Sequence, residues 1–288
     1  MNPSVAQYIK NLELATKRLM KVNLLGNARS VTKGSGLEFN QLRDYQIGDD
    51  VRAIDWNSSA RMNKLLIKEF TDERYKTVIL AIDCSSSCWY GSGNALKQEI
   101  QLQIAALIGY AAYLGKDEVG LVLFANSIQL YIPPAKGKTH IQNILEKIFT
   151  LRATPAGTDI NGALEYIASL RKKNAMVIMI SDFIDEHSFE KKITFVARMY
   201  DLIVVRVIDP YEMHFPSLGL ITVKDSETGQ ETVIDACRST AKKFQAVLQE
   251  RLDEQKKLFA KNRIDCLHVA TNDQLVDQLI YFFKARLI

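Results

Sequence analysis

Histidine and cysteine are scarce in this sequence of 288 residues, with four of each. The cysteines form no CxxC pair and are too few for a disulfide scaffold, so we expect reduced structural thiols. The histidines show no metal-ligand spacing, which argues against a zinc site. The serines at 85–87 are not embedded in the G-x-S-x-G nucleophile elbow, which argues against a Ser/His/Asp hydrolase.

A strong charge of either sign is also missing. The chain carries 37 basic and 33 acidic residues, and a formal net charge of +4 is too small to indicate a nucleic-acid partner. No uninterrupted apolar run approaches the roughly 20 residues of a membrane span, and the opening residues do not begin a signal peptide. We therefore expect no membrane span and a cytoplasmic location.

Short apolar runs alternate with helical patterns from about residue 76 to the C-terminus. The runs that predict strands lie at 77–82, 118–124, 128–132, 175–180, 202–208 and 266–269. The third run is ended by Pro133-Pro134 and follows its neighbour after three residues, which predicts an antiparallel pair. The alternation predicts an α/β fold with a doubly wound, mainly parallel sheet of the Rossmann type, covered by helices on both faces.

The first 75 residues have a different character. Apolar residues at helical spacing over 5–22, with basic residues among them, predict an N-terminal helix. A polar segment rich in charged residues follows, and we expect its Tyr45 and Trp56 to be buried. The predicted organisation is an N-terminal helix with a small appended segment over 1–75, and an α/β domain over 76–288 with a hairpin insert at about 218–235.

Hydroxyl and carboxylate groups gather after two predicted strands. Asp83, Ser85 and Ser87 follow the strand at 77–82 in alternate positions, so their side chains can point the same way. Thr158 precedes a predicted helix, and Asp182 follows the strand at 175–180. Such hard oxygen ligands suit a hard divalent cation, Mg²⁺ above all, with Mn²⁺ and Ca²⁺ as alternatives. The carboxyl ends of parallel strands are also where ligands bind in open α/β folds.

These five residues, in their order along the chain, resemble the metal-ion-dependent adhesion site of von Willebrand factor A-type domains. The resemblance implies that Ser85, Ser87 and Thr158 coordinate the metal directly. It implies that the carboxylates of Asp83 and Asp182 bind the metal directly or through water. It also implies an open position at the metal for an acidic side chain from a protein partner.

The segment at 34–56, with Ser59-Ala60-Arg61 and Ile67-Lys68-Glu69-Phe70 after it, resembles the signature of domain-of-unknown-function family 58. Members of that family join such a segment to a von Willebrand factor A-like fold. They are commonly encoded beside MoxR-type AAA+ ATPases, which implies an adaptor role in a chaperone-like complex. The resemblance brings no established enzymatic activity with it. The favoured hypothesis is therefore a non-enzymatic, metal-dependent protein-interaction module.

Two alternatives stay open at this stage. Asp83 beside a magnesium site could serve a phosphotransferase or hydrolase, although Ser85 stands where such enzymes carry a second acid as proton donor. The module could also be purely structural, with a vestigial metal site.

Four residues near the predicted ligands receive plainer interpretations. Cys84 alternates away from the ligands and is assigned to the core. Asp159 is a candidate helix cap, and His187 a solvated loop residue. For Asp185, an outer role at the metal site and a role in a loop turn are both compatible with the sequence.

Overall fold

The computed structural model describes residues 37–46, 49–72, 77–93, 95–151, 157–185, 187–213, 219–224, 231–272 and 274–286. The chain divides into two compact units, Gly26–Tyr75 and the remainder. The helix predicted over 5–22 lies outside the described residues. Within the ranges given above, no helix is both long enough and apolar enough to cross a membrane.

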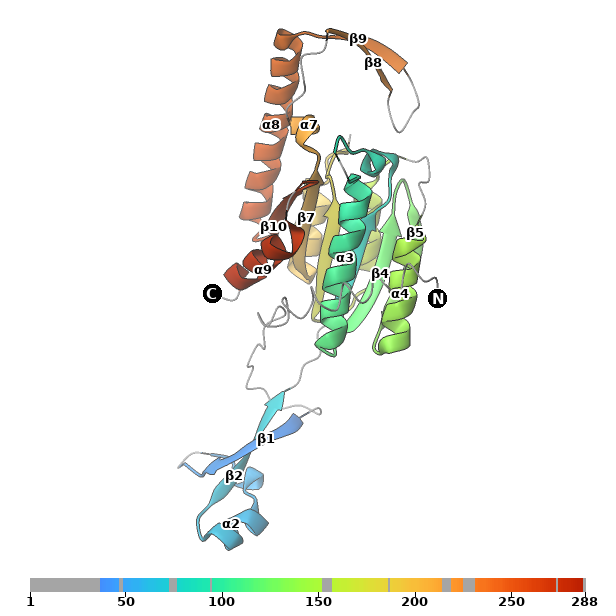
Figure 1. The fold of residues 1–288 in the computed structure, drawn as a ribbon. Coiled ribbons are helices and arrows are strands. Elements are labelled where there is room, and N and C mark those ends of the chain that lie inside the picture. The colour runs from blue at the N-terminus through green and yellow to red at the C-terminus, as the bar shows by residue number, and fades with distance from the viewer. Residues whose placement is uncertain are drawn as a thin grey trace. The chain divides into compact units, whose positions relative to one another are not determined.

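A six-stranded sheet forms the centre of the larger unit, in the order β10-β7-β6-β3-β4-β5 (Figure 1). The strands are β3 Thr77–Asp83, β4 Glu118–Phe124, β5 Ile128–Ala135, β6 Ala175–Ser181, β7 Asp201–Ile208 and β10 Asp265–Ala270. All neighbours are parallel except β4 and β5. Counted along the chain from β3, this is the 3-2-1-4-5-6 order of doubly wound folds. The predicted α/β fold class is confirmed.

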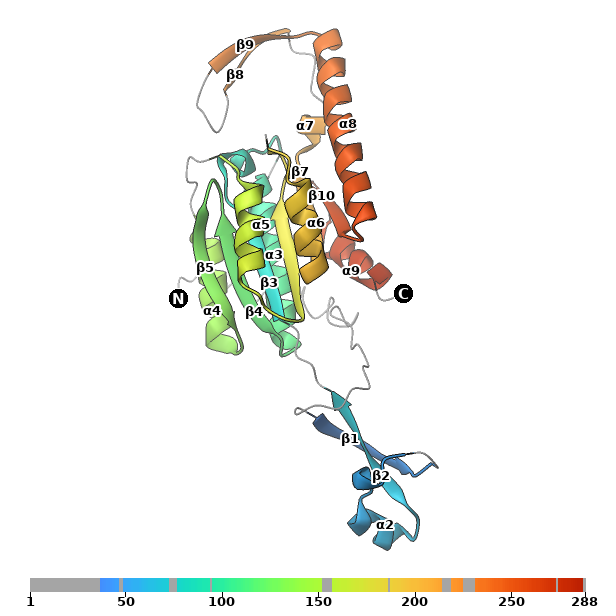
Figure 2. The same cartoon turned by 180° about the vertical axis from the view of Figure 1, so that it is seen from behind.

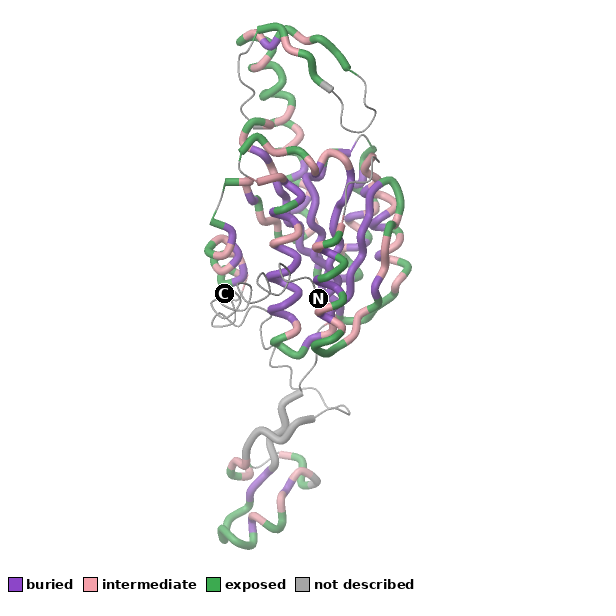
Figure 3. Tube along the Cα trace, turned by 45° about the vertical axis from the view of Figure 1, so that its right-hand side comes forward, coloured by how far each residue is buried: buried purple, intermediate pink, exposed green. Residues whose placement is uncertain are grey.

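Helices cover both faces of this sheet. The helices are α3 Lys97–Leu114, α4 Lys138–Phe149, α5 Ile160–Ser169, α6 Glu190–Met199, α7 Pro210–Met213, α8 Arg238–Lys261 and α9 Leu275–Arg286. Helices α3, α4 and α9 pack on one face (Figure 1), whereas α5, α6 and the end of α8 pack on the other (Figure 2). Buried residues accordingly concentrate along the strands and the inner sides of the helices (Figure 3).

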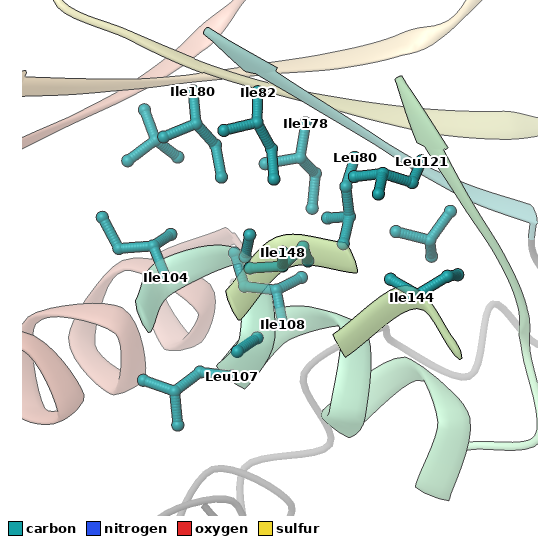
Figure 4. Close-up of a cluster of buried hydrophobic side chains, with 14 of the residues drawn as sticks. Leu80, Ile82, Ile104, Leu107, Ile108, Leu121, Ile144, Ile148, Ile178 and Ile180 are labelled. Carbon is teal, nitrogen blue, oxygen red and sulfur yellow. The ribbon is translucent and has the colours of Figure 1, made fainter. Parts of the chain in front are cut away.

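Branched aliphatic side chains make up most of the core between the sheet and α3. Leu80 and Ile82 of β3 meet Ile104 and Ile108 of α3 there, together with side chains of β4, β6 and α4 (Figure 4). Each such side chain, when fully buried, contributes roughly 1.5–3 kcal/mol to folding. The apolar runs that predict the strands therefore also build the platform that holds the strand ends in place.

Strand β5 extends through Pro133 and Pro134 to Ala135, so the expected end at Ile132 is wrong. A proline removes a hydrogen-bond donor, but β5 is an edge strand and its pairing with β4 shifts register at the prolines, between the Val119–Ala135 and Leu121–Ile132 pairs. Edge strands and such irregularities are where sheets tolerate proline. Pro134 also packs on Gly120 of β4, because a Cβ atom on this glycine would lie only 2.9 Å from Pro134 Cγ. The prolines are thus part of the sheet.

An antiparallel hairpin, β8 Gly219–Lys224 and β9 Glu231–Ala236, is inserted before α8. This is the structure predicted for about 218–235, although the turn itself lies outside the described residues. The first half of α8 leaves Phe244 51% and Val247 66% exposed, whereas Phe259 near its end is buried. The apolar spacing in this helix therefore marks a core-facing stripe only in its second half.

The smaller unit contains β1 Leu37–Asp44, η1 Val51–Ala53, α2 Trp56–Met62 and β2 Leu66–Asp72, with β1 and β2 antiparallel. Arg43 holds Asp49 by two hydrogen bonds of 2.7 and 2.8 Å. Trp56 is 64% exposed, so the expectation that it is buried is wrong. It begins a short helix, and among the residues of this unit whose burial the structure describes, the buried apolar side chains are the aliphatic Ile54, Leu66 and Ile67.

Candidate metal centre

Two buried carboxylates lie at the edge of the sheet where the strand order changes direction. Asp83 is the last residue of β3, and Asp182 follows β6, its hydrogen-bonded neighbour. Asp83 is fully buried and Asp182 only 3% exposed. The carboxyl ends of strands at such a switch point are the usual ligand-binding position of open α/β sheets. The sequence therefore predicted the location of both carboxylates correctly.

Two donors orient the carboxylate of Asp83. The Ser181 hydroxyl donates to Oδ2 at 2.6 Å, and the Ser85 backbone N–H donates to Oδ1 at 2.9 Å. Burial and then the charge of Asp182 raise the pKa of Asp83 to about 6, against the lowering effect of the bond from Ser181. The two hydrogen bonds to the Asp83 carboxylate come from neutral donors, so a cation beside it would supply a counter-charge that these bonds do not.

The hydroxyl groups of Ser85 and Ser87 face each other beside Asp83. Their oxygens are 3.1 Å apart. Adjacent oxygen ligands in an octahedral Mg²⁺ shell are separated by about 2.9 Å, given Mg–O distances of about 2.0–2.1 Å. Ser85 Oγ also lies 3.6 Å from Cys88 Sγ, which accepts a hydrogen bond from the Gln101 side chain of α3. The distance between the two hydroxyl oxygens is thus close to that between neighbouring Mg²⁺ ligands, and the contact with Cys88 helps to position Ser85.

Thr158 is half-buried and lies two residues before the start of α5. Its neighbour Asp159 donates its backbone N–H to the carbonyl of Ala125, directly after β4, at 2.9 Å. This backbone hydrogen bond holds Thr158 at the same edge of the sheet as the two carboxylates. Asp159 accepts from the Gly162 N–H at 2.8 Å, which confirms it as the cap of α5.

The backbone after Asp182 is held in an unusual conformation. Phe183 has a φ of 58°, in the left-handed region that costs a non-glycine residue roughly 1–3 kcal/mol. Its ring is buried against Phe189 and Phe259, and its carbonyl accepts a hydrogen bond from the Gln255 side chain at 3.0 Å. The turn also lets the Ile184 N–H donate to Asp182 Oδ1 at 3.1 Å. Packing thus fixes the direction of the Asp182 carboxylate.

Lys97 and Glu212 complete this cluster, and the sequence did not reveal either of them. The ammonium of Lys97 donates to Asp182 Oδ2 at 2.9 Å and to Glu212 Oε1 at 2.6 Å. Burial lowers the pKa of Lys97, but the charges of Asp182 and Glu212 outweigh it and raise the pKa overall, so the side chain stays cationic. These partners are 85 and 115 positions away along the chain, too far for pattern analysis. The sequence offers only a weak hint, a lysine at the polar start of a helix whose second half is apolar.

The remaining residues behave much as their plainer interpretations predicted. Cys84 belongs to the core, and burial raises the pKa of its thiol to about 12, so it is unreactive. The His187 side chain is 81% exposed. Asp185 accepts the Ile160 N–H at 2.9 Å and so holds the start of α5.

The donor set fits a hard divalent cation. In the part of the chain that the structure describes, no three His, Cys, Asp or Glu side chains gather as metal ligands. A cation here would therefore depend on the serine and threonine hydroxyls, with the carboxylates supplying charge. Oxygen-only sets of this kind suit Mg²⁺, Mn²⁺ and Ca²⁺ rather than zinc.

Comparison with known proteins places the chain in a family. The family described as "protein of unknown function DUF58" matches residues 41–254. The chain belongs to the DUF58 family. Similar proteins include the uncharacterized Rv1480 of Mycobacterium tuberculosis, 26% identical over 230 residues, which cover 79% of this chain and 73% of the relative. The uncharacterized YeaD of Bacillus subtilis is 46% identical over 107 residues, 37% of this chain and 25% of that protein.

Solved structures similar to this DUF58 chain include an aerotolerance-related membrane protein from Bacteroides fragilis. It covers 73% of this chain and 99% of its own, with 14% identity and a TM-score of 0.50. The SpRpn10 VWA domain covers 72% of this chain and 94% of its own, with 10% identity and a TM-score of 0.43. At these identities the likeness concerns the fold and assigns no activity to the DUF58 chain.

Proposed function

We propose that this DUF58 protein is a non-enzymatic protein-interaction module whose binding depends on a divalent cation. The von Willebrand factor A-like fold suggests the interaction role. The observation that carries the metal dependence is the pair of buried carboxylates, Asp83 and Asp182, beside two hydroxyls spaced 3.1 Å apart at the switch point of the sheet.

Five side chains would hold the cation, namely Asp83, Ser85, Ser87, Thr158 and Asp182. When bound, the cation offers a coordination position in which an Asp or Glu of a partner replaces a water. The protein's part is to fix the ligands before the partner arrives, through the bonds from Ser181 and Ser85 to Asp83 and through the packed turn after Asp182. No bond is broken in such an interaction.

Ser85 supports the non-enzymatic reading. A phosphotransferase using Asp83 as its nucleophile needs a proton donor nearby, typically a second acid. Ser85 occupies that position, and it is fully buried with its hydroxyl engaged by Ser87 and Cys88. The partner that we propose is a MoxR-type AAA+ ATPase, the class implied by the family resemblance.

Neighbouring serines allow a matched test of metal binding. Both serines lie in the short helix η2, Ser86–Trp89. Ser87→Ala removes a proposed ligand, whereas Ser86→Ala changes a serine that is not a proposed ligand. Calorimetric titration with Mg²⁺ should show binding to the wild type and to Ser86→Ala, and binding at least about tenfold weaker to Ser87→Ala. Equal affinity of all three proteins would contradict the ligand assignment.

The partner is tested by capture from a lysate of the native cells, with Mg²⁺ or with EDTA. A MoxR-type ATPase should be enriched by the wild type and by Ser86→Ala in Mg²⁺, and lost in EDTA. Capture that is unaffected by EDTA would support a vestigial metal site instead. Turnover of a phosphorylated substrate that is abolished by Asp83→Asn would support the enzyme hypothesis.

A further inference from the structure

Lys97 occupies a position that disfavours a positive charge twice. It is the first residue of α3, where the helix dipole is positive, and its side chain is 1% exposed. A buried ammonium is costly unless it is paired and hydrogen-bonded. Its two carboxylate partners compensate for both effects, and one of them is Asp182, a proposed metal ligand.

The charges around this lysine do not balance. Asp83, Asp182 and Glu212 contribute three carboxylates, against the one ammonium of Lys97. Lys97 compensates Asp182 and Glu212 directly, whereas the bonds to the Asp83 carboxylate come from Ser181 and Ser85. Among these bonded groups two negative charges are left over. The buried guanidinium of Arg206, which interacts electrostatically with Asp182, offsets part of this excess, and a divalent cation would neutralise the rest.

Glu212 links the lysine to a further element. Its Oε1 atom accepts from Lys97, and its Oε2 atom accepts from the Asp209 N–H at 3.1 Å, at the start of α7. Asp209 in turn accepts hydrogen bonds from Ser92 and Thr271. The ammonium of Lys97 therefore joins the start of α3, the end of β6 and the short helix α7.

We propose that Lys97 is a built-in counter-cation of the metal site, which shares Asp182 with the divalent cation and so sets the affinity of the site. In the metal-free protein the lysine neutralises Asp182 and keeps the empty site folded. When a cation engages Asp182, the bond from Lys97 weakens, and the ammonium is held by Glu212 instead. This inference rests on the proposed metal site and adds a competitor to it.

Two substitutions with opposite expected effects test the proposal. Lys97→Met keeps the length of the side chain without its charge, so Mg²⁺ affinity should rise by at least about tenfold, because a repelling positive charge is gone. Glu212→Gln removes the second partner of the lysine and one negative charge, so Mg²⁺ affinity should fall. General damage to the fold would lower the affinity in both variants.

Thermal melting supplies a second readout. In EDTA, Lys97→Met should melt at a lower temperature than the wild type, because Asp182 loses its counter-charge, and saturating Mg²⁺ should remove most of that difference. Lys192→Met is the matched control, since this half-exposed lysine pairs with Glu165 on the surface at 2.6 Å. It should match the wild type in both measurements.

The outcomes separate this inference from the proposed function. If the wild type binds Mg²⁺ and Lys97→Met binds it no more tightly, the counter-cation role is wrong while the metal site stands. If only Lys97→Met binds Mg²⁺, the lysine replaces the metal in the natural protein, and the metal-dependent function is wrong. If neither protein binds Mg²⁺, both are wrong. Should Lys97→Met not fold even in Mg²⁺, Glu212→Gln decides, and an affinity equal to or above that of the wild type overturns the proposal.

Discussion

Asp83 carries its charge at the end of a hydrophobic strand, in an interior that penalises ionisation. Its pKa is about 6 in the folded protein, against an ordinary value of 3.8. Because the folded state holds the proton more tightly, Asp83 stabilises the metal-free fold below about pH 4, and this contribution is lost as the pH rises through about 6. A divalent cation instead requires the ionised form.

Stabilisation by Mg²⁺ should therefore grow with pH. We expect the rise in melting temperature on adding Mg²⁺ to be clearly larger at about pH 7.5 than at about pH 5, because protons compete with the metal below the pKa of Asp83. Differential scanning calorimetry at both pH values measures it. Asp83→Asn should show little Mg²⁺ effect at either pH. An Mg²⁺ effect that is independent of pH would contradict the role of this carboxylate.

The hydroxyl of Ser181 has a structural task that alanine cannot perform. It donates to the buried Asp83 carboxylate at 2.6 Å and accepts from the Phe183 N–H at 3.0 Å. Ser181→Ala should lower the free energy of unfolding by about 1–3 kcal/mol, the usual cost of unsatisfied buried polar groups. Denaturation in urea measures the loss. Ser169→Ala, at an exposed hydroxyl bonded only to its own helix, should change it little.

At the scale of elements, the contact between β4 and β5 depends on a missing side chain. A Cβ atom on Gly120 would lie 2.9 Å from Pro134 Cγ, and the proline ring cannot rotate away. We expect Gly120→Ala to destabilise the protein by about 1–3 kcal/mol through overpacking. Gly93→Ala is the control, because nothing lies within 4 Å of the added atom there. Similar urea midpoints for the two variants would show that β5 shifts freely.

Elements and binding site were predictable to different degrees, for physical reasons. The strands β3 and β6 are continuous apolar runs up to the polar residue or two at their ends, so each strand's own sequence predicts burial on both faces. Asp83, Ser85, Ser87 and Asp182 could be placed because a strand end is a local feature. The Lys97 pair could not be predicted, since a pair between distant residues depends on which strands become neighbours.

Two further misses arise from context that the local sequence does not contain. The proline pair suggests the end of a strand, but an edge strand tolerates it, and edge position follows from the order of the whole sheet. An aromatic residue such as Trp56 suggests a buried side chain that fixes a loop. Whether it is buried depends on the size of the hydrophobic core in its unit. In the described part of the smaller unit, the buried apolar side chains are Ile54, Leu66 and Ile67, and Trp56 is not among them.

For the whole molecule, the division into two compact units predicts which part of the chain metal binding stabilises. A ligand stabilises the cooperative unit that holds its site. Hydrogen exchange should slow in Mg²⁺ at residues 83–88 and 181–185 of the larger unit, and stay unchanged at 49–66 of the smaller one. Mass spectrometry of peptides from both regions measures this. Equal slowing in both units would show that they unfold together.

The two prolines of β5 also affect the tendency of this protein to aggregate through the edge of its sheet. An exposed sheet edge offers backbone donors and acceptors on which a strand of another molecule can add, and repeated addition leads to fibrous aggregates. Pro133 and Pro134 lie in this edge strand, lack backbone N–H donors and fix the local backbone, so an added strand finds fewer groups to pair with here. The residues that close the sheet on this side therefore also act as a barrier to its polymerisation.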